Sequence, residues 1–338
     1  MTKAFVKKLR VLFLIVGATL LVLLIRKIGI APIVDDIRTM GWRLIPILSI
    51  SLIWYILYTE AWRQFLFRIG GGISFWELFR IKIAGEAVNT LTPVNFLGGD
   101  PLRIHLLKKN FATTEGAASV VVDRTLHSAA TLLVIVFGIT VSFIGFKTLP
   151  ANLRYGVPIA TTIAVLFMTF VLIHQRKGFF SLLMNLSKRL GIKKEFSEKT
   201  ISRFEELDSH MIDFYTADHK GFWVALSCHT AGRLLGIAEI YAMGRCVSDK
   251  FTLFAAIVLC ALAPIVNAAF TFVPGALGVM EGAYSGVLYL LHLDPSIGIA
   301  IQISKRIRAA LWITLGLVFL GTHDREKVWK EEELMEEI

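Results

Sequence analysis

Three basic side chains, Lys305, Arg306 and Arg308, lie close together in the last long apolar segment of this 338-residue chain. They stand nine to twelve residues into the segment 296–322, which is otherwise apolar enough to cross a membrane. Each such charge costs about 2.5–3.5 kcal/mol on membrane-insertion scales, so the cluster needs compensation. A later helix start would avoid that cost, but 309–321 alone is too short to span. Because Arg offers paired donors to a phosphate, we favour a cationic pocket for a phosphate group.

Two carboxylates follow the two places where a proline interrupts an apolar stretch. Asp100 lies seven residues after Pro93, and Glu281 lies seven residues after Pro274. Asp100 and Arg103 are also compatible with an intrahelical ion pair at a helix start, with Asp100 as the N-cap. Glu281 has no basic residue within four positions. It therefore caps a helix, binds a proton or pairs with a cation of the last helix.

The backbone at both interruptions is incompatible with a continuous membrane helix. The stretch Asn89–Asp100 reads NTLTPVNFLGGD, in which a proline without an N–H and a Gly-Gly pair favour a turn. The second interruption reads TFVPGALGVME. Irregular backbone at membrane depth survives only where it is buried in protein or lines a wet cavity. We therefore expect two re-entrant helical hairpins, the first built from 75–90 and 100–109.

Two stretches, roughly 44–146 and 221–322, share one order of elements: a spanning helix, an interrupted hairpin and a second spanning helix. Their polar positions keep equal offsets from the two prolines, and the matched pairs are Glu86 with Asn267, Asp100 with Glu281, and Arg124 with Lys305. Inverted repeats of this kind are a common transporter plan, in which the breaks mark a substrate site near the membrane midplane. We therefore expect Pro93 and Pro274 to approach each other there. The alternative is coincidence, because Pro-Gly interruptions are common in membrane helices.

The apolar segments predict an all-α polytopic membrane protein, with 1–338 as a single transmembrane domain. About six spanning helices are expected, at 10–28, 44–67, 117–146, 155–174, 221–247 and 296–322. Between them, 175–220 is polar with apolar residues at helical spacing, which predicts an amphipathic helix at the cytoplasmic surface. The positive-inside rule places this segment and both termini in the cytoplasm, around a cell membrane. In this arrangement Arg26 and Lys27 lie on the wrong side.

Composition supports the membrane class. Hydrophobic residues make up 55% of the chain, and the mean hydropathy is +0.64. The net charge of +10 fits cytoplasmic loops and affinity for anionic lipid headgroups. The sequence has no basic stripe on a polar domain, so we do not expect a nucleic-acid partner. No metal-ligand spacing and no nucleotide-binding loop is present, so we expect neither metal nor cofactor. Asp123, His127, His229, Arg233 and Glu239 are expected to form structural pairs between helices.

The blocks GEAVNTLTPVNFLGGDPLR (85–103) and VPGALGVMEGAY (273–284) resemble one known family. This is the lysylphosphatidylglycerol synthase transmembrane region, or flippase-like domain, and the resemblance covers nearly the whole chain. It implies lipid translocation, because in bifunctional bacterial members the membrane part flips the aminoacylated phospholipid that a cytoplasmic domain makes. Other members are associated with hopanoid or polyprenol-linked glycan pathways, so the substrate does not carry over. Nothing after Gly321 resembles an aminoacyl-transferase domain, so we expect a stand-alone member.

Three hypotheses of function follow. The first is a translocase that moves a lipid with an anionic phosphate headgroup, a phospholipid or a polyprenyl phosphate, between leaflets. The second is an integral-membrane enzyme with Glu86, Asp100 and Glu281 as acid/base groups. The third is an accessory subunit of a biosynthetic complex. The protein partner is therefore either a biosynthetic enzyme or a second copy of this chain. The lipid, the direction of movement and the energy source also stay open. The predicted substrate-binding residues are Glu86, Asn89, Pro93, Asp100, Arg103, Arg124, Pro274, Glu281, Lys305, Arg306 and Arg308.

Overall fold

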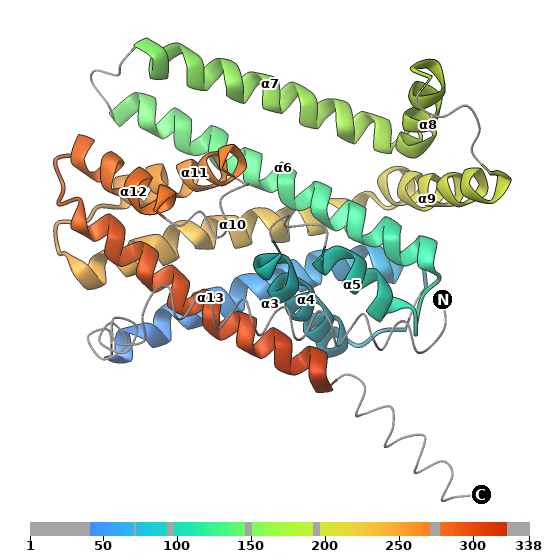
Figure 1. Cartoon of the computed structure of the whole chain (residues 1–338), viewed down its shortest axis with the longest axis horizontal. Coiled ribbons are helices and arrows are strands. Elements are labelled where there is room, and N and C mark those ends of the chain that lie inside the picture. Colours follow the sequence, from blue (N-terminus) through green and yellow to red (C-terminus); the bar gives the residue numbers. More distant parts are fainter. Residues whose placement is uncertain are drawn as a thin grey trace, which may run out of the picture.

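The computed structural model describes residues 41–70, 72–92, 98–145, 151–191, 197–270 and 278–322. Within these ranges every regular element is a helix (Figure 1). The expected first spanning helix at 10–28, the turns containing Pro93 and Pro274, and the C-terminal tail lie outside the described residues. The expected approach of the two prolines therefore stays a prediction.

The first half of the chain forms the helices expected before and after the first interruption. A 3-10 turn, η1 (Gly41–Arg43), leads into α3 (Leu44–Arg68), which is followed by α4 (Phe75–Leu91), α5 (Gly99–Leu107) and α6 (Thr113–Gly145). The Ser74 hydroxyl caps α4 by accepting a hydrogen bond from the Glu77 N–H at 3.2 Å. The expected N-cap at Asp100 is wrong. Gly98 holds that position without a side-chain bond, because the Asp100 carboxylate pairs with Arg124 instead.

The polar segment in the middle of the chain folds into two helices rather than one. The helix α7 (Ala151–Gln175), which covers one of the expected spans, is followed by α8 (Phe179–Arg189) and α9 (Glu198–Ala217). Gly178 permits the sharp turn out of α7, since its φ is +103°. The Asp208 carboxylate then holds the start of α8 by accepting hydrogen bonds from the Phe180 and Ser181 N–H groups, at 2.9 and 2.8 Å.

The second half repeats the order of long helix, two short helices and long helix. These are α10 (His219–Val247), α11 (Leu253–Ala269), α12 (Val279–Leu290) and α13 (Ser296–Thr322). Asp218 caps α10 through the Gly221 N–H at 2.9 Å, and Thr252 caps α11 through the Ala255 N–H at 3.2 Å. Glu281 caps α12 by accepting from the Gly278 N–H at 2.9 Å. The cap role expected for Glu281 is thus confirmed.

Helices from the two halves pack against one another rather than forming separate bundles. α3 runs along α10, α4 lies against α13, and α11 lies against α6 (Figure 1). Two of these contacts depend on glycine. A Cβ at Gly316 would lie 2.6 Å from the carbonyl oxygen of Ile83 and 2.6 Å from the Ala87 Cβ. A Cβ at Gly138 would lie 2.3 Å from the Ala261 Cβ.

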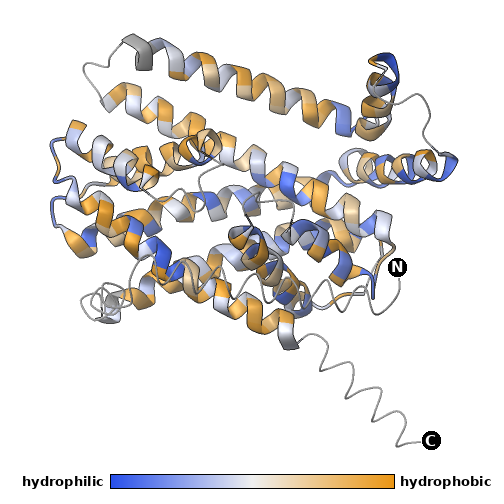
Figure 2. Ribbon diagram, viewed as in Figure 1, coloured by the Kyte–Doolittle hydropathy of each residue, from blue (hydrophilic) through white to orange (hydrophobic). Residues whose placement is uncertain are grey.

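Three of the described helices are long and apolar enough to cross a membrane: Leu44–Arg68, Thr113–Gly145 and Tyr155–Gln175. The last of these lies at the edge of the fold and is hydrophobic along most of its length (Figure 2). Its side chains are largely exposed, Ile163 and Phe167 to 62% and 65%. An exposed apolar helix of this length belongs in lipid, so the structure is that of a helical membrane protein.

Candidate ligand cavity

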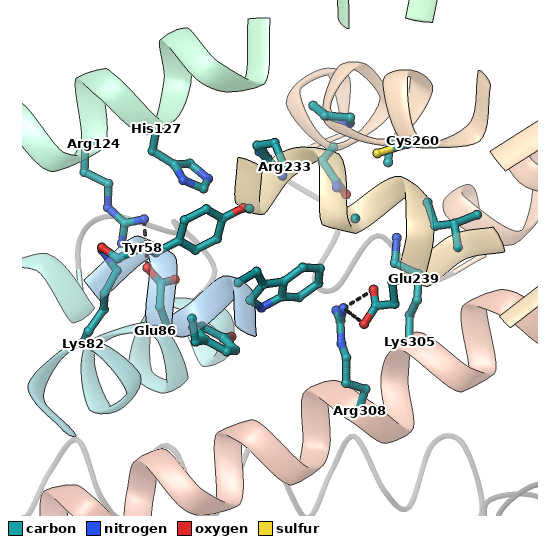
Figure 3. Close-up of a pocket in the computed structure, with 18 of the residues that line it drawn as sticks. Tyr58, Lys82, Glu86, Arg124, His127, Arg233, Glu239, Cys260, Lys305 and Arg308 are labelled. Carbon is teal, nitrogen blue, oxygen red and sulfur yellow. Dashed lines mark hydrogen bonds and ion pairs between the residues drawn. The ribbon is translucent and has the colours of Figure 1, made fainter. Parts of the chain in front are cut away.

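A cavity of about 460 Å³ lies where α3, α4 and α6 meet α10, α11 and α13. In Figure 3, Lys82, Glu86 and Arg124 gather on one side, and Glu239, Lys305 and Arg308 gather on the other. Both halves of the chain therefore supply charged groups. The lining includes Trp54, Tyr55, Tyr58, Lys82, Glu86, Asp123, Arg124, His127, Arg233, Glu239, Cys260, Asn267, Lys305 and Arg308.

The short helix α4 brings a lysine into the centre of the fold. Lys82 is buried, and its Nζ lies 2.9 Å from Asp123 Oδ1 on α6. It also donates to the Tyr58 carbonyl at 2.7 Å and lies over the ring of Trp62 at 5.4 Å from the ring centre. These partners compensate the charge of Lys82, so the lysine closes one end of the cavity as part of an ion pair.

Two arginines and two carboxylates tie α4, α5 and α6 together at the wall of the cavity. The fully buried Arg103 contacts Glu86 at 2.5 Å, and Arg124 contacts Glu86 at 3.0 Å and Asp100 at 2.7 Å. The amide of Asn89 closes the junction between α4 and α5. It accepts from the Gly99 N–H at 2.7 Å and donates to Asp100 at 3.1 Å. The positive charges of this cluster are therefore matched by carboxylates.

The cluster on α13 divides into three different environments. Arg308 contacts the Glu239 carboxylate at 2.5 Å and lies 4.6 Å from the centre of the Trp54 ring. Arg306 forms an ion pair with Glu281, so the cationic partner expected for Glu281 is present. Lys305 donates to the Tyr284 hydroxyl at 3.1 Å and lies over its ring. No carboxylate pairs with Lys305 within the described part of the chain.

Two histidines, His127 and His229, lie close to the Asp123 carboxylate at the wall of the cavity. His229 Nε2 on α10 lies 3.2 Å from Asp123 Oδ1, and its Nδ1 lies 3.3 Å from Nδ1 of His127. The Nε2 atom of His229 makes no hydrogen bond of good geometry, so its contact with Asp123 is an electrostatic one. This series of close contacts runs from Asp123 through His229 to His127, which lines the cavity.

Comparisons with known proteins agree with this arrangement of helices. The family model described as "Lysylphosphatidylglycerol synthase TM region" matches residues 10–317. The chain belongs to this family. The UPF0104 membrane protein PH1989 of Pyrococcus horikoshii is 23% identical over 336 residues, which cover 89% of this chain and 93% of that protein. No solved structure matches the chain.

For this family member, the cavity contains four of the eleven residues predicted to bind substrate: Glu86, Arg124, Lys305 and Arg308. Asp100 and Arg103 lie behind the lining and pair with its charged groups Arg124 and Glu86, and Asn89 donates a hydrogen bond to Asp100. Arg306 and Glu281 pair with each other and are not among the lining residues. Pro93 and Pro274 are outside the described residues. A role in substrate binding stays a prediction for all eleven.

Several lining residues were not predicted as part of a site. The pairs expected between helices are present for Asp123 with His229 and for Glu239 with Arg308. Arg233, however, donates from Nε to the Thr131 hydroxyl at 2.7 Å and has no carboxylate partner among the described residues. Only its place in the middle of a helix long enough to span could have indicated it. Nothing in the sequence pattern distinguishes the lining tyrosines from ordinary core residues.

Proposed function

We propose that this chain is a lipid translocase that moves a lipid with an anionic phosphate headgroup between membrane leaflets. The observation that carries this proposal is the cavity, which holds more basic than acidic side chains between helices long enough to span. Ionisable groups at membrane depth are expensive, and they usually mark substrate or ion pathways. Membership of the lysylphosphatidylglycerol synthase family supports the same reading.

The depth of the cavity follows from its neighbours. Trp54, Tyr55 and Tyr58 occupy the middle of α3, a helix of 25 residues that is apolar enough to cross the membrane. α10 and α13 have 29 and 27 residues and pack along α3 and α4. At 1.5 Å per residue both are long enough to span, although they carry charges. Together with α3, α6, α7 and the expected helix at 10–28, they give the six spanning helices of our proposal.

The short helices fit two re-entrant hairpins. α4 and α11 have 17 residues each, and α5 and α12 have 9 and 12. At 1.5 Å per residue the longer pair reach only about 26 Å, less than the roughly 30 Å of the hydrocarbon core. We infer that each pair enters and leaves on one side of the membrane.

Matching contacts favour an inverted repeat of roughly 44–146 and 221–322. α4 packs against α13 as α11 packs against α6. In each contact a glycine, Gly316 or Gly138, lies against an isoleucine carbonyl and against an alanine four residues further on. The ion pairs agree as well. A carboxylate in the first turn after each break pairs with an arginine of the next long helix, Asp100 with Arg124 and Glu281 with Arg306.

In this proposal the phosphate enters the cavity while the acyl or prenyl chains stay in lipid. A smaller cavity of about 170 Å³ between α3, α4 and α13 shares Tyr55, Glu86 and Arg308 with the first. In this proposal the smaller cavity is the side opening through which the lipid chains extend into the membrane while the headgroup lies in the larger cavity. The energy for transport would come from an ion gradient or from the concentration gradient of the lipid itself. In this proposal both termini, α8 and α9 lie on the cytoplasmic side of a cell membrane.

An integral-membrane enzyme is the second candidate, and the His127–His229–Asp123 series is the observation that favours it. A carboxylate that orients one imidazole and polarises the next resembles the arrangement used for general base catalysis. The acid/base groups suggested by the sequence fit less well. Glu86, Asp100 and Glu281 all form ion pairs with arginine, so their carboxylate oxygens are already engaged by the protein.

Reconstitution into liposomes tests the proposal. Phospholipids with a fluorescent acyl chain and different phosphate headgroups are placed in both leaflets, and a membrane-impermeant quencher reports the fraction exposed outside. We expect quenching of the protected fraction only in protein-containing vesicles, with the lipid chemically unchanged. An Arg245→Gln variant serves as the control, because Arg245 lies on α10 near Asp249, away from the cavity lining. A new lipid product would instead support the enzyme. If the lipid neither moves between leaflets nor is converted to a product, both candidate functions are refuted.

A further inference from the structure

The charges that line the cavity do not balance. Five basic side chains and three carboxylates line it in the described structure. Each carboxylate has a basic partner: Asp123 pairs with Lys82, Glu86 with Arg124, and Glu239 with Arg308. Arg103 and Asp100, in the layer behind, contact each other at 3.6 Å and add no net charge. Two cations, Arg233 and Lys305, are left without a carboxylate partner among the described residues.

The two remaining cations have neutral neighbours within the described ranges. Arg233 Nε donates to the Thr131 hydroxyl at 2.7 Å, and Lys305 Nζ donates to the Tyr284 hydroxyl at 3.1 Å. Both residues line the cavity, one from α10 and one from α13. The segments that join α4 to α5 and α11 to α12, residues 93–97 and 271–277, contain no acidic residue. The excess of two positive charges therefore faces the cavity.

Arg233 and Lys305 are half-buried, and positive charge that is partly withdrawn from water is stabilised when a ligand of opposite charge compensates it. A phosphodiester supplies one negative charge and would leave one of the two cations uncompensated. A phosphomonoester carries about −1.5 to −2 at pH 7 and three strong acceptor oxygens. An arginine with two parallel donors and a lysine acting as a point charge are complementary to these oxygens.

We propose that Arg233 and Lys305 form a binding site for the dianionic head of a lipid phosphomonoester. This inference rests on the proposed translocase function and specifies its substrate class. Arg233 holds two phosphate oxygens from α10, and Lys305 neutralises the remaining charge from α13. The aromatic side chains Trp54, Tyr55 and Tyr58 surround the head from α3. Headgroup selection follows from charge, since a diester of the same chains matches only half of the excess.

The test compares two lipids with identical acyl chains, phosphatidic acid as the phosphomonoester and phosphatidylglycerol as the phosphodiester. Binding to the full-length protein in detergent is measured at pH 8 by native mass spectrometry and by thermal stabilisation. We expect phosphatidic acid to bind at least about tenfold more tightly. Arg233→Gln and Lys305→Gln should each weaken the binding of phosphatidic acid by about tenfold or more, as expected for a lost charged hydrogen bond. Each should also reduce the preference for phosphatidic acid over phosphatidylglycerol. Arg245→Gln should change the affinity for neither lipid.

Charge-conserving variants separate loss of charge from loss of folding. Arg233→Lys and Lys305→Arg should keep most of the preference, whereas a loss equal to that of the Gln variants would overturn the proposal. Equal affinity of the wild type for the two lipids would also overturn it. Inorganic phosphate is titrated in a further arm. If it stabilises the protein as strongly as phosphatidic acid, the ligand is a soluble phosphate and the lipid assignment is wrong.

The outcome is independent of transport. Phosphatidic acid that binds through Arg233 and Lys305 but never crosses between leaflets would refute the translocase function and keep the site. Transport of phosphatidylglycerol without preference for phosphatidic acid would keep the translocase and refute the site.

Discussion

Removing the charge of Arg103 should destabilise the protein more than removing any exposed charge. The Arg103 side chain is fully buried, and its guanidinium contacts Glu86 at 2.5 Å and Asp123 at 3.4 Å, with Trp62 at 5.3 Å on its face. An Arg103→Met variant keeps much of the volume but leaves buried carboxylates with one cation fewer. Breaking a buried ion pair by removing one partner costs about 3–5 kcal/mol.

The matched control is Arg63→Gln. Arg63 pairs with Glu60 at 2.8 Å, but its side chain is 42% exposed, and such pairs contribute about 0–1 kcal/mol. A change of 1 kcal/mol shifts the melting temperature of a large domain by roughly 2 °C. We therefore expect the melting temperature in detergent to fall by about 6–10 °C for Arg103→Met and by at most about 2 °C for Arg63→Gln.

A double variant isolates the cause of the loss. In Arg103→Met/Glu86→Gln the nearest carboxylate is neutral, so part of the lost stability should return. The interaction energy between two residues in contact is typically 0.5–3 kcal/mol, which such a cycle can resolve. If Arg103→Met lowers the melting temperature no more than the Arg63 control does, the buried charge network does not hold α4, α5 and α6 together.

Three further predictions concern the cations of α13, the close contact between α6 and α11, and the topology. Lys305→Met should reduce transport of an anionic lipid at least about tenfold at normal protein abundance, measured in vesicles, because Lys305 lines the cavity. Arg306→Met should mainly reduce the abundance or melting temperature, since it leaves Glu281 without its cation; equal transport defects in both folded variants would contradict this. Gly138→Val should cost about 1–3 kcal/mol or more, because its Cβ would lie 2.3 Å from a side chain of α11, whereas Gly282→Ala has open space and should be neutral or slightly stabilising. A cysteine at Lys188 should react with an impermeant thiol reagent only from the cytoplasmic side, and labelling from outside would refute the topology.

The positions of the helices follow largely from local sequence. Long apolar segments, and the Pro and Gly residues that interrupt them, predict α3, α6 and α13 within a few residues of their ends. The cap of α12 is equally local, since Glu281 lies three residues after Gly278 and its carboxylate reaches back to the Gly278 N–H. These features depend on residues within one or two helical turns, so they are readable before the fold is known.

The identity of the uncompensated charges is decided by tertiary structure. Lys305 and Arg308 are three residues apart in one helix, yet Arg308 meets Glu239, 69 residues away, while Lys305 faces the cavity. The sequence indicated a cluster of cations at membrane depth, but not which member remains available to a ligand. Arg233 was expected to be structural and proves to line the cavity. Pairing depends on which faces of distant helices come together, and hydrophobic periodicity fixes only which side of a helix is polar.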